Sequence, residues 1–175
     1  ARTMEYGGET LRMNIVRDIR DRLAAQARIH HLAHHDALTG MLNRAAFMER
    51  LQQALQRARQ KAGHLALLFI DLNNFKRVND SLGHLEGDRV LVTVAERVRT
   101  CLRSTDQVAR FGGDEFVVLL EDIRGPEDVH QVLQALLDVV EVPVETMGRA
   151  LSVTPSIGIA LHPEHGDTSE LLIQL

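Results

Sequence analysis

The apolar residues of this chain recur with two different periods, and each period predicts one type of element. Spacings of three and four are typical of amphipathic helices, and they predict helices over residues 44–60, over residues 87–102 and from Pro126 onward. Compact apolar runs predict buried strands at residues 64–75, 107–111 and 115–121. We also expect a short helix at residues 75–82, a hairpin over about 142–162, and a last, incomplete helix with Thr168 or Ser169 as its N-cap.

The order of these elements predicts the fold class. Strands and helices follow one another as β-α-β-β-α-β, with additions. This order is typical of the ferredoxin-like α+β fold, in which an antiparallel sheet carries its helices on one face. We therefore expect one such domain in the larger, C-terminal part of the chain.

The first residues predict a strand that belongs to a different domain. Gly7 and Gly8 indicate a turn, after which Leu11, Met13 and Ile15 alternate with polar residues. A single strand cannot bury its apolar face alone, so we assign residues 1–15 to a domain that lies upstream. Because the chain begins at Ala1 rather than at Met, we expect it to be part of a longer protein.

Residues 16–35 predict a helix that links this strand to the main domain. Ile19 and Leu23 are four residues apart and Ile29 and Leu32 are three apart, as in a coiled-coil seam. The step of six from Leu23 to Ile29 breaks the heptad, which indicates an imperfect two-stranded linker helix. The alternative is a single helix that packs on its own domain.

Composition and charge restrict the function classes. The chain has 175 residues, 45% of them hydrophobic, which is enough for a sizeable core. A net charge of −4 gives no basic field for nucleic acid. Neither a transmembrane segment nor a signal peptide is recognisable, because the longest obvious apolar run is residues 65–70. The lone Cys101 excludes an internal disulfide and favours a reducing cytoplasm.

The stretch "VARFGGDEFVVLL", residues 108–120, carries the candidate chemistry. Asp114 and Glu115 stand side by side at the tip of a hairpin whose flanks are apolar. Gly112 and Gly113 permit positive φ and let the backbone approach a bulky anionic ligand. The simplest alternative is a polar turn whose acids are solvated, since acidic turns are common.

Asp71 is the expected partner of these acids, because it lies at the C-terminal end of the strand "LALLFID", residues 65–71. If that strand lies beside the hairpin, Asp71 and Asp114 converge. Carboxylates that share one place repel each other unless a cation neutralises them. Hard oxygen ligands select Mg²⁺ or Mn²⁺, which commonly bridge substrate phosphates, and Lys76 could balance phosphate charge.

These residues resemble the GGDEF family of diguanylate cyclases. "RFGGDEF" (110–116) resembles the family motif, and "HDALTGMLNR", "IDLNNFKRVNDSLGHLEGD", "RSTDQVARFGGDEF" and "VTPSIGIA" resemble further family segments in the family's order. The resemblance covers roughly residues 31–175 and implies a nucleotidyl cyclase or polymerase palm-like fold. Residues 1–15 resemble the last strand of a PAS sensor domain. The predicted organisation is a PAS remnant (1–15), a linker helix (16–35) and a GGDEF domain truncated at its C-terminus (36–175).

The resemblance implies that two GTP molecules, one on each protomer of a homodimer, condense to cyclic di-GMP with release of pyrophosphate. It implies Asp71, the Leu72 carbonyl and Asp114 as ligands of Mg²⁺ or Mn²⁺. The 3′-hydroxyl of one GTP attacks the α-phosphate of the other, with Asp114 as candidate base and Glu115 beside it. Lys76 would stabilise phosphate charge in the transition state.

The remaining implied roles concern nucleotide recognition and product inhibition. The resemblance implies that the N–H groups of Asn74 and Phe75 contact phosphate and that the nucleotide lies close to Gly112 and Gly113. It implies that Asn79 and Asp88 contact the guanine edge, with His84 nearby. It also implies that inhibitory cyclic di-GMP binds Arg103 and Asp106. Each has a structural alternative. Asn79 and Asp88 could be helix caps, His84 could be structural, and Arg103 could simply pair with Asp106 at a helix end.

Other features have structural interpretations. We expect Phe111 and Phe116 in the core. "HHLAHHD" (30–36) spaces two histidines as metal ligands are spaced, but we interpret it as a solvated linker end.

Two departures from the family pattern bear on activity. Asn73 stands where many members have Asp, which removes a charge near the metal. The chain also ends before the segment whose lysine and arginine grip the triphosphate, so we expect weak GTP binding if the polypeptide ends there. The alternative function is a non-catalytic module that binds GTP or cyclic di-GMP; the intact acids favour catalysis.

Overall fold

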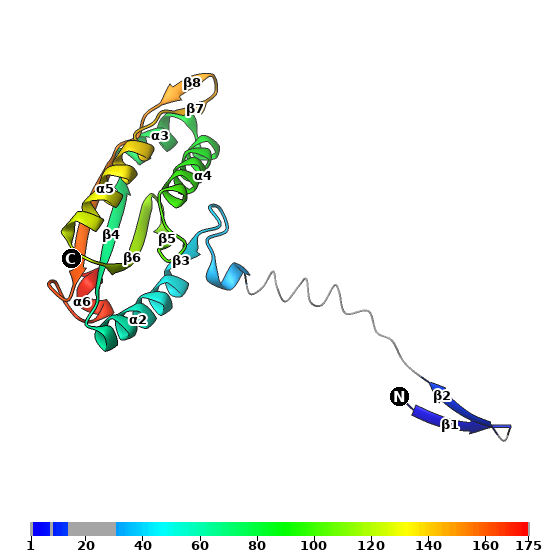
Figure 1. Ribbon diagram of the computed structural model, residues 1–175. Helices are drawn as coiled ribbons and strands as arrows, with labels where there is room; N and C mark the ends of the chain where they lie inside the picture. The colour runs from blue at the N-terminus through cyan, green and yellow to red at the C-terminus, as the bar shows by residue number, and fades with distance from the viewer. Residues whose placement is uncertain (1, 8, 14–30, 175) are drawn as a thin grey trace. The chain divides into compact units, whose positions relative to one another are not determined.

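The computed structural model describes residues 2–7, 9–13 and 31–174 (Figure 1). The chain forms two compact units, Ala1–Leu32 and Ala33–Leu175. In the first, β1 (Arg2–Tyr6) and β2 (Glu9–Met13) form an antiparallel hairpin in which Tyr6 faces Glu9. The strand predicted after Gly7 is therefore present, and the sequence interpretation missed the strand before it.

The predicted linker helix falls mostly outside the described residues, as do Ile19, Leu23 and Ile29 of its expected seam. Residues 31–34 are helical. The pairing of two linkers and the assignment of residues 1–15 to a sensor domain stay predictions.

The second unit is built on a five-stranded sheet in the order β3-β5-β6-β4-β9 (Figure 1). Its strands are β3 (Leu42–Asn43), β4 (His64–Leu72), β5 (Gln107–Gly112), β6 (Glu115–Ile123) and β9 (Pro155–His162). The helices are α2 (Arg44–Lys61), α3 (Phe75–Leu82), α4 (His84–Thr100), α5 (Pro126–Val140) and α6 (Ser169–Ile173). The pairs formed by β4, β5, β6 and β9 are antiparallel, and only the short β3 runs parallel to its neighbour β5. The predicted ferredoxin-like α+β core is confirmed, with β4, β5, β6 and β9 as its four strands.

The expectation that the helices lie on one face is wrong for the whole domain. On one face, α4 and α5 pack against alternate residues of the central strands, such as Leu68 and Val118. On the other, α2 and α6 pack against the intervening residues, such as Leu67 and Leu119. Since β4 and β6 are apolar at consecutive positions, both faces of the sheet must be covered. The additions to the core provide the second cover.

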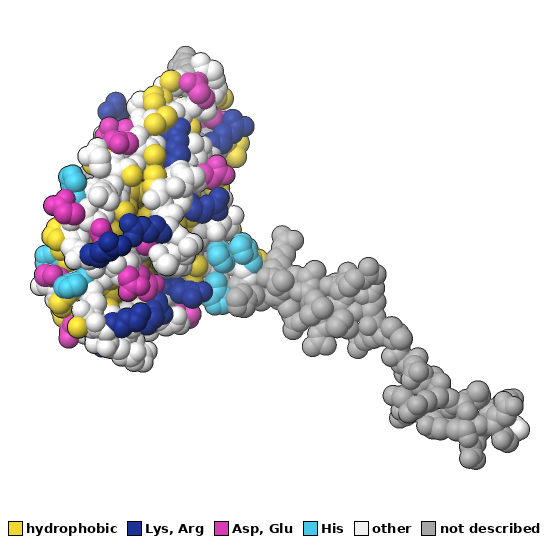
Figure 2. Space-filling model, viewed as in Figure 1, with side chains coloured by type: hydrophobic (Ala, Val, Ile, Leu, Met, Phe, Trp, Pro, Cys, Tyr) yellow, Lys and Arg dark blue, Asp and Glu magenta, His cyan; other side chains and the backbone are white. Residues whose placement is uncertain are grey.

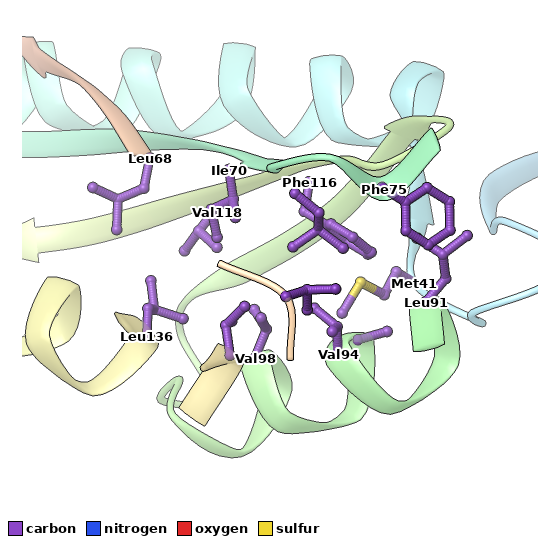
Figure 3. Close-up of a cluster of buried hydrophobic side chains, with 14 of the residues drawn as sticks. Met41, Leu68, Ile70, Phe75, Leu91, Val94, Val98, Phe116, Val118 and Leu136 are labelled. Atoms are coloured by element: carbon purple, nitrogen blue, oxygen red, sulfur yellow. The ribbon is translucent and has the colours of Figure 1, made fainter. Parts of the chain in front are cut away.

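The larger cluster of buried side chains lies between the sheet and helices α4 and α5 (Figure 3). Figure 3 shows Leu68, Ile70, Phe116 and Val118 pointing from the sheet toward α4 and α5. Phe75, at the start of α3, belongs to the same cluster and is 5% exposed. The core therefore holds rigid the end of β4 and the start of α3, where the candidate site lies.

Helix ends follow the chemistry of their sequences. Asn43 caps α2 by accepting from the Ala46 N–H at 2.9 Å, and Thr168 caps α6 by accepting from the Leu171 N–H. Thr168, rather than Ser169, is thus the N-cap. Pro126 begins α5, as predicted.

The hairpin expected over residues 142–162 is only partly correct. β7 (Val144–Thr146) and β8 (Arg149–Leu151) form a small separate hairpin, whereas β9 joins the main sheet beside β4. Within the part of the chain that the structure describes, no helix is long and apolar enough to cross a bilayer. On the face shown in Figure 2, basic and acidic side chains are interspersed.

Candidate active site

Two glycines and an acidic pair form the tip of the β5–β6 hairpin. Gly112 pairs with Glu115, so Gly113 and Asp114 form a tight turn. Gly112 and Gly113 have φ of +144° and +53°, a region in which side chains with a Cβ are strained. A Cβ at either position would meet open space, so the turn exposes its backbone outward.

Asp71 lies directly beside this tip. In the antiparallel β4–β6 pair, Asp71 is opposite Glu115, and on its other side it is opposite Ser156 of β9. The predicted neighbourhood of β4 and the hairpin is therefore confirmed, although the residue opposite Asp71 is Glu115 rather than Asp114. Two acids in register repel each other.

Among residues 31–174, these three carboxylates lack a compensating partner. Within residues 31–174, Asp71, Asp114 and Glu115 form no ion pair and accept no side-chain hydrogen bond. Asp71 and Glu115 are exposed and Asp114 is half-buried. A divalent cation would relieve the repulsion, and carboxylate and carbonyl oxygens suit Mg²⁺ or Mn²⁺.

The described residues contain no group of three His, Cys, Asp or Glu side chains placed to hold a metal ion. The expected ligand set does not require one, because it consists of Asp71, Asp114 and the backbone carbonyl of Leu72. The residues present therefore fit a hard divalent ion bound in part by the protein and in part by substrate oxygens.

Arg110 fixes the tip of the hairpin to the start of the domain. Its Nε and Nη2 donate to the Gly113 carbonyl at 3.0 and 2.7 Å, and its Nη1 donates to Asp36 Oδ1 at 3.0 Å. Asp36 also accepts from the N–H and hydroxyl of Thr39, at 2.8 and 2.7 Å. The side chains of Arg110 and Asp36 are 12% and 23% exposed, so this ion pair is largely shielded from water.

The sequence interpretation singled out neither Asp36 nor Arg110. Asp36-x-x-Thr39 is the pattern of an aspartate whose side chain closes its own turn, which could have identified the first. The Arg110 side chain reaches the turn three residues later in the chain. The sequence alone does not show this contact, because it depends on how the strands are paired.

The loop after β4 presents backbone donors. Asn74 precedes α3 with φ of +59° and makes no side-chain cap bond, so the first N–H groups of α3, including that of Phe75, remain available to a phosphate. Lys76 follows, exposed and without an ion-pair partner in residues 31–174. The phosphate contacts expected of these residues from the sequence stay predictions.

Asn73 ties the same loop to β9. Its Oδ1 accepts from the Ser156 hydroxyl at 2.8 Å, its Nδ2 lies 3.2 Å from Thr154 Oγ1, and its backbone N–H donates to the Thr154 carbonyl at 2.8 Å. The amide thus orients the loop after Asp71. A cavity of about 730 Å³ lies between α3 and residues 146–154, with Asn73, Asn74 and Arg77 in its lining.

The three residues expected near guanine lie on α3 and α4. Asn79 is half-buried in the middle of α3, His84 is exposed at the start of α4, and Asp88 is half-buried one turn later. Neither Asn79 nor Asp88 caps a helix, because Asn74 and Gly83 occupy the N-cap positions of α3 and α4. The capping alternative is wrong for both.

Glu86, next to these residues, escaped the sequence interpretation. It is 6% exposed, accepts from the Thr146 hydroxyl on β7 and pairs with Arg89 at 3.0 Å. It fastens the β7–β8 hairpin to the first turn of α4. A buried glutamate in a helix carries no signal by which sequence alone distinguishes it from a solvated one.

Arg103 and Asp106 enclose the turn between α4 and β5. Asp106 Oδ2 accepts from the Arg103 N–H at 3.0 Å, and the Asp106 N–H donates to the Arg103 carbonyl at 3.1 Å. Burial raises the pKa of Asp106 despite that hydrogen bond. The two side chains form no ion pair, and both line a cavity of about 510 Å³ together with Arg99 and His35.

The expected aromatic and histidine positions are also visible. Phe116 is fully buried, as predicted, whereas Phe111 is half-buried, with the Phe47 ring edge-on at 5.4 Å and the Arg44 guanidinium 5.3 Å from its centroid. In the histidine tract, His30 lies outside the described residues, and His35 Nδ1 is 3.0 Å from the Gly40 carbonyl.

Comparison with known proteins identifies the family. Residues 33–175 match the family model described as "Diguanylate cyclase, GGDEF domain". The chain belongs to the GGDEF family. The GGDEF domain of TpbB from Pseudomonas aeruginosa, solved from an N-terminally shortened protein, has a TM-score of 0.78 and 45% identity over 81% of this chain and 83% of that one. The GGDEF domain of DgcB from Caulobacter crescentus, solved in complex with c-di-GMP, has a TM-score of 0.74 and 26% identity over 81% of this chain and 84% of that one.

Curated GGDEF relatives differ in the activity that their names state. Diguanylate cyclase TpbB of Pseudomonas aeruginosa is 45% identical over 84% of this chain and 34% of its own length. Cyclic di-GMP phosphodiesterase NbdA of the same species is 43% identical over 86% of this chain and 19% of its own length. The chain thus spans about a fifth to a third of these proteins.

Proposed function

We propose that this GGDEF domain is the catalytic output domain of a diguanylate cyclase, which condenses two GTP molecules into cyclic di-GMP. The observation that carries the proposal is the hairpin tip, where Asp71, Asp114 and Glu115 gather without a protein partner in residues 31–174. An acidic tip of this kind, beside free helix N–H groups, is suited to a nucleotide and a divalent cation.

Each residue has a defined part in this proposal. Asp71, the Leu72 carbonyl and Asp114 would hold Mg²⁺ or Mn²⁺, which would supply positive charge to offset that of the triphosphate. The N–H groups of Asn74 and Phe75 orient the phosphates. Lys76 stabilises the charge that develops on them.

Bond formation follows from this placement. The 3′-oxygen of one GTP bonds to the α-phosphorus of the other, and the bond from that phosphorus to the pyrophosphate oxygen breaks. Asp114, with Glu115 beside it, accepts the 3′-hydroxyl proton. Two such steps yield one cyclic di-GMP and two pyrophosphates. Because residues 31–174 contain one such hairpin tip, the proposal requires a homodimer. It also includes a cytoplasmic location, where GTP is available.

Product inhibition is part of the same proposal. The cavity that Arg103 and Asp106 line has an arginine without an ion-pair partner in residues 31–174, and arginine forms bidentate bonds to phosphate or to guanine. The turn that contains both residues leads directly into β5 and hence into the hairpin. A ligand held there would contact the lead-in to the candidate site.

A second candidate is a non-catalytic module that binds GTP or cyclic di-GMP. The observation that favours it is the 43% identity to a relative named as a phosphodiesterase. The intact acids favour the first candidate.

Incubation of the purified protein with GTP and Mg²⁺, followed by chromatography, distinguishes the two. Cyclic di-GMP formation supports catalysis. Nucleotide binding measured by calorimetry without any product supports the second candidate and contradicts the first.

A further inference from the structure

Gly87 occupies a position in α4 where glycine is otherwise unfavourable. It is the fourth residue of the helix, and its N–H lies 3.2 Å from the Gly83 carbonyl, as helical geometry requires. It does not have positive φ, so the backbone would accept a residue with a Cβ. Glycine inside a helix is less stable than alanine, and such a position commonly has a packing reason.

The space above Gly87 is filled by the amide of Asn79. A Cβ built on Gly87 would lie 1.9 Å from Asn79 Oδ1 and 3.0 Å from Asn79 Cγ. It would also lie 3.2 Å from Phe75 Cζ. The side chain of Asn79 therefore rests directly on the α-carbon of Gly87.

The corner between α3 and α4 creates this contact. Gly83, with φ of +85°, donates its N–H to the Asn79 carbonyl at 2.9 Å and ends α3. Asn79 and Gly87 each lie four residues from Gly83, one helical turn away on either side. The corner thus brings α3 and α4 together at these two residues.

The Asn79 amide has no hydrogen-bond partner among the residues that the structure describes, although it is half-buried. A carboxamide offers two donors and an acceptor, and half-buried polar groups normally find partners. Its placement without one indicates that the amide is held ready for a ligand.

We infer that Gly87 is a positioning residue that sets the location of the Asn79 amide and thereby the preference for guanine over adenine. This inference rests on the proposed function, in which Asn79 contacts the guanine edge. Guanine and adenine present opposite donors and acceptors on that edge, so a displaced amide loses discrimination as well as affinity.

The test compares Gly87→Ala, Asn79→Ala and the double variant, using calorimetric titration with non-hydrolysable GTP and ATP analogues. Gly87→Ala should fold with a melting temperature close to that of the wild type, because the helix preference of alanine offsets the shifts that the Asn79 amide and the Phe75 ring must make. Affinity for the GTP analogue should fall about five- to tenfold, the loss of one hydrogen bond. Affinity for the ATP analogue should not change.

The double variant separates positioning from packing. If Gly87 acts through Asn79, adding Gly87→Ala to Asn79→Ala should change nothing further. Gly63→Ala is the matched control, since its Cβ would have no neighbour closer than 3.8 Å, and it should bind as the wild type does.

An unchanged ratio of GTP to ATP affinity in Gly87→Ala overturns the inference, as does a full effect that persists in the double variant, because contact with Phe75 then explains it. If Gly87→Ala fails to fold, recovery of folding in the double variant supports the amide contact, and failure to recover refutes it. A wild-type protein that binds neither analogue refutes the proposed function itself.

Discussion

Removal of Arg110 should destabilise the domain far more than removal of a surface arginine. In Arg110→Ala, the Gly113 carbonyl loses two donors and Asp36 loses its cationic partner. Thr39 still donates twice to Asp36, so that carboxylate is not left wholly unpaired. The hairpin tip, however, loses its side-chain connection to Asp36.

The magnitude follows from the burial of the pair. Fully exposed ion pairs contribute about 0–1 kcal/mol, whereas breaking a buried pair costs about 3–5 kcal/mol. With side chains 12% and 23% exposed, Arg110 and Asp36 are close to the buried limit. Because Thr39 continues to donate hydrogen bonds to Asp36, we expect a loss of about 2–3 kcal/mol in the free energy of unfolding.

Urea unfolding followed by circular dichroism measures this loss. Arg57→Ala is the matched control, because Arg57 also makes a forked bond to a glutamate, Glu121, but its side chain is 48% exposed. That control should lose less than about 1 kcal/mol. Equal losses in the two variants would refute the argument from burial, as would a double Arg110→Ala, Asp36→Ala variant whose loss equals the sum of the single losses.

The same pair should make stability depend on pH. Burial by itself raises the pKa of Asp36, but hydrogen bonds from Thr39 and Arg110 outweigh it and hold that pKa below its usual value. A depressed folded-state pKa contributes stability above the unfolded-state pKa of about 3.9, and this is lost as pH falls through the folded value. The difference between wild type and Arg110→Ala should therefore shrink below about pH 4.

Three further predictions concern activity. Asp114→Ala removes a proposed metal ligand and base, so cyclic di-GMP synthesis should fall by several orders of magnitude while the circular dichroism spectrum is kept; near-wild-type synthesis would contradict the mechanism. Leu23→Asp with Ile29→Asp, outside the described residues, should lower the rate per protomer and steepen its dependence on protein concentration, unless sedimentation shows an unchanged oligomeric state. Arg103→Ala should weaken cyclic di-GMP binding in calorimetry and relieve product inhibition with little change in initial rate, and unchanged affinity would remove Arg103 from that site.

Local patterns predicted the elements well because their causes are local. The apolar period of α2 and the proline that starts α5 gave boundaries within a residue or two of those observed. The errors concern partners that are distant in sequence. β9 pairs with β4 across more than 80 residues, and the choice between that pairing and a local hairpin depends on long-range packing that no nearby residue encodes.

The coverage of both sheet faces could have been inferred. The run from Leu65 to Ile70 is apolar at every position, and a strand with one wet face would alternate instead. The β-α-β-β-α-β order predicts the core correctly, but it does not predict that α2 and α6 cover the second face of the sheet. The continuous apolar strands indicated that helices must also cover the second face.

For the candidate site, the sequence predicted which acidic residues come together, and only the structure revealed the residues that hold them in place. Asp71 and the hairpin acids were expected together because each stands where an apolar strand ends. The residues that hold them in place, Arg110 and Asp36, are 74 positions apart. An arginine or an aspartate has many possible ion-pair partners along the sequence, and only the fold determines which pair forms.

Asn73 affects both the position of the loop after Asp71 and the charge available for metal binding. An aspartate there could accept from Ser156 but could not donate to Thr154, so the amide suits the anchoring of the loop to β9. The proposed ligand set is then two carboxylates and one carbonyl rather than a closed cage. Because Mg²⁺ takes six oxygen ligands in near-octahedral geometry, water and the triphosphate would have to supply the rest. Metal and nucleotide would therefore bind as one unit, which would make the hairpin tip selective for a phosphate-bearing substrate rather than for a free ion.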